Sequence, residues 1–252
     1  MIEFEVADWA AWAPGLHSRE DWLAWAQAPF LPHGDDTPAL AEVPAMQRRR
    51  IDRLGRMAIQ AAYWCQPQEG GQAPLVFASR HGDVACSVGL LETLAAEQPL
   101  SPTAFGLSVH NAIAALYSII RGERGNYLAL AAGTSTPEAA MFEAAGLLAD
   151  GAPEVLVICY EGALPAIYAG FADEPDPFHA WCWRVRAAGQ GGKAIRLDWE
   201  ASPPPGSGQA PSHGLPHALE VMRFLLAGQP GLWHARDAAA GVGGHWVWRQ
   251  DA

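Results

Sequence analysis

A serine between two threonines, Ser135, stands directly before an apolar helical pattern and is the candidate nucleophile of this chain. Its hydroxyl could attack an acyl carbonyl if a neighbouring base accepted the proton. His213 and His217 stand one helical turn apart near the start of a later predicted helix and could supply that base. Such a serine is more often a cap or turn residue, and each histidine is more often a helix cap or a surface residue. Acyl transfer or hydrolysis is therefore the minority interpretation of these residues.

The four cysteines, Cys65, Cys86, Cys159 and Cys182, lie far apart in the sequence. They form no Cys-x-x-Cys pair and have no histidine nearby at the spacing of zinc ligands. This spacing predicts buried free thiols. We expect neither a metal ion nor another cofactor.

Strand and helix patterns alternate through the middle of the chain. Short apolar runs predict strands at 75–79, 127–132 and 155–159, with helices between them at 83–96 and 136–150. In the second helix we expect Thr136 to be the cap and Pro137 the first residue. This alternation is typical of an α/β fold with a parallel sheet covered by helices on both faces.

The other predicted elements surround this α/β unit within a single domain, 1–252. Residues 44–64 have the pattern of one amphipathic helix, and residues 104–120 are apolar almost all round, which indicates a buried helix. The alternating segments 179–186 and 193–199 predict a β-hairpin. The Pro- and Gly-rich segment 201–212 is a linker by composition, and it leads to a helix at 215–227 and strands at 232–235 and 245–249.

The composition excludes several classes of function. A formal net charge of −11 argues against a broad nucleic-acid surface. Charged residues make up only 17% of the chain, which hints at a face covered by a partner. The N-terminus lacks the features of a secretory signal, and no run reaches the roughly 20 apolar residues of a membrane span, so we expect a cytoplasmic protein.

Five arginines, at 48, 49, 50, 53 and 56, crowd the predicted helix 44–64. Ile51, Leu54 and Met57 fall on the other side of that helix, so a solvated face is the favoured interpretation. Binding of an anionic partner is the alternative.

Three stretches together resemble the β-ketoacyl synthases of the thiolase-like fold: 101–162, 213–231 and 238–250. The first follows the synthase order of interface helix, strand, nucleophile turn, buried helix and strand. The resemblance implies a thiolase-like layered α/β fold with a complete first half and a strongly shortened second half. In this register the turn LALAAGTST places Gly133 where condensing enzymes have their nucleophilic cysteine.

The resemblance also bears on the two histidines of the family. The first, in a Gly- and Thr-rich turn, has no counterpart in this sequence, and His213 is the closest match to the second. Without a thiol at Gly133 the chain cannot form the acyl thioester of ordinary condensation. The resemblance therefore implies that the chain is not a condensing enzyme by itself.

The pattern resembles most closely the small chain length factors of aryl polyene-type pathways. Such proteins form heterodimers with a full-length β-ketoacyl synthase and shape the tunnel for the acyl chain on an acyl carrier protein. The small and apolar residues of 104–120 suit both roles, since they allow a partner helix to approach and can line a tunnel. The expected tunnel and dimer-interface residues are Leu107, Ser108, Val109, His110, Ala112, Ile113 and Leu116.

Two other functions stay open at this point. One is an acyl-thioester hydrolase or acyltransferase that uses Ser135 with His213 or His217 on the same scaffold. The other is a self-associating scaffold protein with no acyl ligand.

Overall fold

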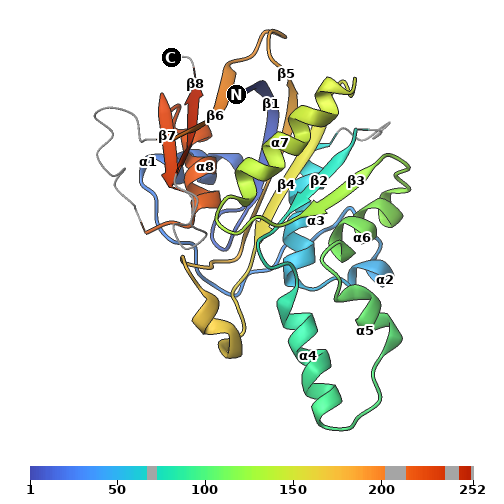
Figure 1. Ribbon diagram of the computed structural model, residues 1–252. Coiled ribbons are helices and arrows are strands. Elements are labelled where there is room, and N and C mark those ends of the chain that lie inside the picture. The colour runs from blue at the N-terminus through green and yellow to red at the C-terminus, as the bar shows by residue number, and fades with distance from the viewer. Residues whose placement is uncertain (67–72, 202–213, 236–243, 251–252) are drawn as a thin grey trace.

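The computed structural model describes residues 1–66, 73–201, 214–235 and 244–250 (Figure 1). In these residues eight strands form one sheet in the order β3-β2-β4-β5-β1-β6-β8-β7. The strands are β1 (Ile2–Trp12), β2 (Leu75–Ala78), β3 (Tyr127–Leu130), β4 (Val155–Glu161), β5 (His179–Ala187), β6 (Ala194–Glu200), β7 (Gly231–Ala235) and β8 (His245–Gln250). Only β3, β2 and β4 are parallel, and each remaining neighbour is antiparallel. The α/β class is confirmed, whereas the expectation of a parallel sheet is correct for those three strands alone.

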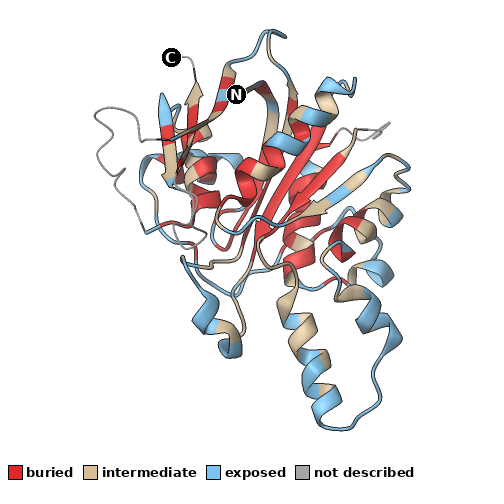
Figure 2. Ribbon diagram, in the orientation of Figure 1, coloured by how far each residue is buried: buried red, intermediate tan, exposed pale blue. Residues whose placement is uncertain are grey.

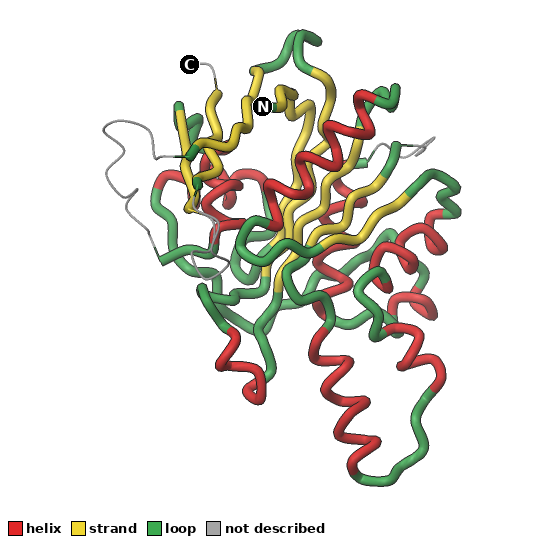
Figure 3. Tube along the Cα trace, in the orientation of Figure 1, coloured by secondary structure: helices red, strands yellow, loops and turns green. Residues whose placement is uncertain are grey.

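Helices cover both faces of the sheet (Figure 3). On one face α3 (Arg53–Cys65) and α6 (Ala112–Arg121) pack on residues such as Phe77 and Ile158. On the other face α1 (Arg19–Gln27), α7 (Thr136–Ala149) and α8 (His217–Leu226) pack on a core rich in tryptophan. Because β4 lies between the two layers, all of its residues are buried (Figure 2).

The predicted hairpin of 179–186 with 193–199 is wrong, because β1 lies between β5 and β6. The connection between these strands passes over β1 and is held there by Glu5. The Glu5 carboxylate accepts hydrogen bonds from the backbone N–H groups of Gly189 (2.7 Å), Gln190 (3.0 Å) and Gly192 (2.9 Å). Alternation identified both strands but not their separation by a strand from the start of the chain.

Two predicted helices are each broken in two. Residues 44–64 form α2 (Ala45–Arg48) and α3, because Asp52 begins α3 by accepting a hydrogen bond from Gly55 N at 2.7 Å. Residues 104–120 form α5 (Pro102–Leu107) and α6. The break between them brings His110 to Ser79, with Nε2 at 2.9 Å from the carbonyl oxygen.

The arginines of this region are only in part a solvated face. Arg48, Arg53 and Arg56 donate to backbone carbonyls of neighbouring segments and so hold the turn between α2 and α3 in place. Arg49 and Arg50 are exposed. The helix break therefore gives three of the five a structural role.

The helices α4 (Val84–Ala95) and α5 project from the sheet (Figures 1 and 2). Neither has a buried residue, although α4 is strongly apolar. Leu94 is 57% exposed and Phe105 64% exposed. These apolar surfaces are unpartnered in the single chain, which is typical of a surface that another molecule covers.

Among the described helices, none combines the length and the apolar character that a membrane crossing requires. The predicted linker 201–212 lies outside the described residues except for Ala201.

Candidate functional site

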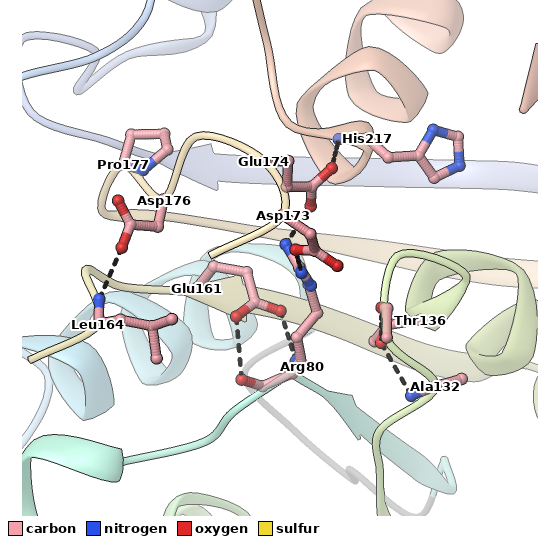
Figure 4. Close-up of polar contacts among 12 residues, drawn as sticks. Arg80, Ala132, Thr136, Glu161, Leu164, Asp173, Glu174, Asp176, Pro177 and His217 are labelled. Atoms are coloured by element: carbon pink, nitrogen blue, oxygen red, sulfur yellow. Dashed lines mark hydrogen bonds and ion pairs between the residues drawn. The ribbon is translucent and has the colours of Figure 1, made fainter. Parts of the chain in front are cut away.

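The turn between β3 and α7 contains Gly133, the residue expected at the nucleophile position. Its φ is +58°, and a Cβ added there would have nothing within 4 Å. The Thr136 side chain closes the turn, because its hydroxyl accepts from Ala132 N at 3.0 Å and donates to the Gly133 carbonyl at 2.7 Å (Figure 4). The turn has room for a side chain at 133, and the sequence supplies none.

Ser135 is the residue immediately before α7 and is 8% exposed. Thr136 was expected in that place, but it is already the first residue of the helix. The Ser135 hydroxyl accepts a hydrogen bond from Trp246 Nε1 at 3.0 Å. Within the described residues no hydrogen bond joins Ser135 to a histidine, and His213 lies outside those residues. A nucleophilic role for Ser135 stays a prediction.

His217 is the first residue of α8 and is buried, so the interpretation as a surface residue or helix cap is wrong. Its Nε2 lies 2.5 Å from Oε1 of Glu138, which is also buried. Burial alone would raise the pKa of Glu138, but the His217 charge and hydrogen bond hold it below its usual value. Against the opposing effect of burial, Glu138 raises the pKa of His217. The two groups therefore form a charged pair.

Two further side chains contact this charged pair. Trp248 Nε1 donates to Glu138 at 2.9 Å, and the His234 ring stacks on His217 with 3.6 Å between the ring centroids. Burial and the nearby His217 charge lower the pKa of His234 to about 3. His234 is thus a neutral ring packed on a charged one.

The expected tunnel residues lie around α5 and α6. Four of them, Leu107, Ala112, Ile113 and Leu116, line one cavity of about 300 Å³ together with Ile51 and Cys86 on facing segments. The remaining three are outside that lining. Val109 is 48% exposed, the Ser108 hydroxyl donates to the Phe105 carbonyl, and His110 contacts Ser79.

Two other cavities flank the first turn of α4. One of about 400 Å³ is lined by His81, Val84, Ser87, Leu164, Tyr168 and Phe171. A smaller one of about 200 Å³ shares His81, Val84 and Leu164 with it, and shares Asp52 and Asp83 with the cavity at α6. The start of α4 is therefore surrounded by mainly apolar space.

A polar cluster at the ends of β2 and β4 was missed by sequence reasoning (Figure 4). Arg80 N donates to Glu161 Oε1 at 2.6 Å, and the guanidinium forms ion pairs with Asp173 and Glu174. Burial raises the pKa of Glu161 to about 8, against the lowering effect of Arg80. Polar residues directly after two apolar strands were the available signal, since such ends meet at one edge of a sheet.

The sheet also has an unpaired edge. β3 is the outermost strand beside β2, and its Leu128 is 38% exposed. Ile119 on α6 (71%) and Phe142 on α7 (37%) are exposed apolar residues on the two helices that contact β3. Such an edge favours addition of another chain.

The cysteines agree with the prediction of free thiols, three of them buried and Cys86 half-buried. Within the residues that the structure describes, no three His, Cys, Asp or Glu side chains are grouped so as to hold a metal ion.

Comparisons with solved structures place the fold. The chain is similar to a chain of the complex between a ketosynthase (ApeO) and its chain length factor (ApeC) from Xenorhabdus doucetiae, with 24% identity and a TM-score of 0.79. That match covers 99% of this chain and 100% of the other. The ishigamide ketosynthase/chain length factor matches with 15% identity and a TM-score of 0.61 over 80% of this chain and 68% of that one. A β-ketoacyl synthase from Burkholderia phymatum matches with 14% identity and a TM-score of 0.56, over 80% of this chain and 65% of that one.

These likenesses show the layered thiolase-like fold of ketosynthases, and the lower coverage of the synthase is consistent with a shortened second half. In sequence, no curated protein matches the chain. The family model described as "Beta-ketoacyl synthase, N-terminal domain" matches residues 22–249. Because this match spans most of the 252 residues, the chain belongs to the β-ketoacyl synthase family.

Proposed function

We propose that the chain is a non-catalytic chain length factor that forms a heterodimer with an active β-ketoacyl synthase. In this pair the synthase forms the carbon–carbon bonds on an acyl chain held by an acyl carrier protein. The present chain completes the dimer and shapes the acyl tunnel, in a polyketide or fatty-acid-like pathway of the aryl polyene type.

A glycine at the expected nucleophile position is the observation that carries this proposal. Gly133 leaves a turn with open space before α7 but no group that could hold an acyl thioester. The candidate hydroxyl, that of Ser135, accepts a hydrogen bond from Trp246, and the Thr136 hydroxyl is bonded within the turn. A scaffold kept without its nucleophile suits a subunit whose role is binding and shape.

The apolar surfaces support a partner of the same fold. The β3 edge, with Leu128 and the neighbouring Ile119, offers backbone and apolar groups to a second sheet. The projecting helices α4 and α5 expose further apolar side chains. Likeness to chains from ketosynthase/chain length factor complexes favours a synthase as that partner.

The cavities around α4 support a role in setting chain length. Leu116 and Ile113 line one of them, and both lie on α6, close to the β3 edge. In a heterodimer such a wall would limit the space for the acyl chain, because extra methylene groups have no room once the cavity is full.

Co-expression with the β-ketoacyl synthase encoded nearest to its gene tests the proposal. We expect a stable heterodimer that condenses acyl groups, and no condensation by this chain alone. A monomeric chain that hydrolyses acyl thioesters and carries an acyl adduct on Ser135 would contradict the proposal and support the hydrolase or acyltransferase alternative.

A further inference from the structure

The loop 162–178 joins β4 to β5 and is held at its base by Arg80 (Figure 4). Arg80 follows β2, and its side chain is only 8% exposed. Its guanidinium pairs with Asp173 and, at 2.5 Å, with Oε1 of Glu174. A buried guanidinium with two carboxylates on one loop fixes that loop in position and orientation.

Other contacts tie the same cluster to two more elements. Oε2 of Glu174 accepts a hydrogen bond from the backbone N–H of His217 at 2.9 Å, which joins the loop to the start of α8. The backbone N–H of Arg80 donates to Glu161 at the end of β4. Arg80 and Glu174 together therefore link the loop, the sheet and α8.

Arg80 supplies the positive charge that faces the carboxylates of this cluster. The carboxylates of Asp173 and Glu174 pair with the guanidinium, and a third carboxyl group, that of Glu161, accepts from the Arg80 backbone N–H. The raised pKa of Glu161 means that this carboxyl is protonated at neutral pH, so the charge of Arg80 is shared by Asp173 and Glu174. Without Arg80 the two carboxylates would lie together without a cation.

The loop has little else to hold its outer part. It contains the 3₁₀ helix η1 (Ala166–Phe171), which has no buried residue, and Ile167 is 75% exposed. Yet Leu164, Tyr168 and Phe171 form one wall of the cavity of about 400 Å³. The opposite wall is Val84 and Ser87 on α4, which begins four residues after Arg80.

We infer that Arg80 is a positioning residue that sets the spacing between α4 and the loop 162–178, and with it the width of the apolar cavity open to an acyl chain. This inference rests on the proposed chain length function. Arg80 acts through the loop and does not contact the acyl chain itself.

The test replaces Arg80 in the heterodimer and in the full chain alone. With Arg80→Met we expect longer and more varied products, because the loop wall moves outward. We also expect roughly tenfold faster hydrogen exchange at Leu164 N and Tyr168 N, whose hydrogen bonds lie within the loop. Arg80→Lys keeps the positive charge but loses the planar guanidinium that binds two carboxylates. We therefore expect smaller changes in product length and in hydrogen exchange than with Arg80→Met. Arg186→Met, which removes an ion pair with Glu154 elsewhere on the sheet, is the control.

Further variants keep the outcomes separate. Ser87→Phe fills the cavity and should shorten the products. Glu174→Gln weakens the same clamp while Asp173 stays paired, and serves if Arg80→Met does not fold. Unchanged exchange in the loop, or unchanged products in a heterodimer where Leu116→Phe does shorten them, would overturn the role of Arg80 alone. Failure of the wild-type chain to bind a synthase would instead overturn the proposed function, while the exchange measurement would still decide whether Arg80 holds the loop.

Discussion

His217 and Glu138 form a buried ion pair that joins α8 to α7, with 2.5 Å between Nε2 and Oε1. Sequence reasoning assigned neither side chain to an ion pair. The two residues are separated by 78 others, and no local pattern links them. The pair lies next to the turn that carries Gly133 and Ser135, because Glu138 is in the first turn of α7. It therefore fixes the element that follows the nucleophile position.

Removal of one partner of this pair should destabilise the chain strongly. Glu138→Gln leaves the buried His217 without its counter-charge, and we expect a loss of about 3 kcal/mol in the free energy of unfolding. Glu154→Gln, at a partly exposed pair with Arg186, should cost less than about 1 kcal/mol. Urea denaturation of both variants measures the difference. Equal losses would mean that the buried pair contributes no more to stability than the partly exposed pair.

The buried Glu161 makes stability depend on pH in a defined direction. Its pKa is about 8 in the folded chain against 4.5 for the free group, so the unfolded chain loses this proton at lower pH. Between these values the contribution of Glu161 to stability falls as the pH rises. Glu161→Gln should therefore gain stability over the wild type as the pH rises toward 8. Unfolding curves of the variant and the wild type at several pH values measure the difference in stability. A difference that does not change with pH would contradict the prediction.

His179 should make the stability of the fold depend on pH between about 4 and 6.5. Burial lowers its pKa to about 4, against a hydrogen bond to the Pro177 carbonyl at 2.9 Å that raises it. The unfolded chain binds a proton near the usual value of 6.5, and the folded chain does so only near 4. Stability should fall as the pH drops between these values, and His179→Gln should weaken that dependence. A variant with the same acid dependence as the wild type would contradict the assignment.

A thiol at the nucleophile position should not restore condensation. Gly133→Cys has space for its side chain, and its positive φ should cost about 1–2 kcal/mol. We expect a folded chain whose new thiol reacts with an alkylating reagent faster than the buried Cys159, and no decarboxylating condensation. Condensation by this variant alone would show that the rest of the machinery is present.

The β3 edge should be the site of partner binding. Ile119→Arg places a charge on the apolar surface beside that edge, where Ile119 is 71% exposed, so the fold should tolerate it while the heterodimer weakens. Met46→Arg, at a residue of α2 that is 77% exposed, is the matched control. Size-exclusion chromatography of both complexes distinguishes them, and equal binding would place the interface elsewhere.

Local patterns predicted the elements well where they depend on neighbours in sequence. Asp83 caps α4 where the helix 83–96 was expected, and the apolar run in β4 indicated a buried strand. Periodicity alone revealed neither the break at Asp52, where a local cap begins α3, nor the break at His110, which contacts the distant Ser79.

The candidate site was predictable in part for the same reason. The turn around Gly133 and four residues that line the cavity of about 300 Å³ followed from the family resemblance, and their role in a tunnel stays a prediction. The Arg80 clamp and the partner of His217 depend on contacts between segments far apart in sequence, which no spacing within one segment encodes. The position of β1 between β5 and β6 was missed on the same grounds.

The most direct test of the chain length role is the product length of the heterodimer after Leu116→Phe. Leu116 is half-buried and lines the cavity of about 300 Å³ at α6, so the larger ring should shorten the space for the acyl chain. Leu23→Phe on α1, where the side chain is 48% exposed, is the control. We predict shorter products from an intact complex with Leu116→Phe and unchanged products with Leu23→Phe. Unchanged products from an intact Leu116→Phe complex would contradict the tunnel role of this chain.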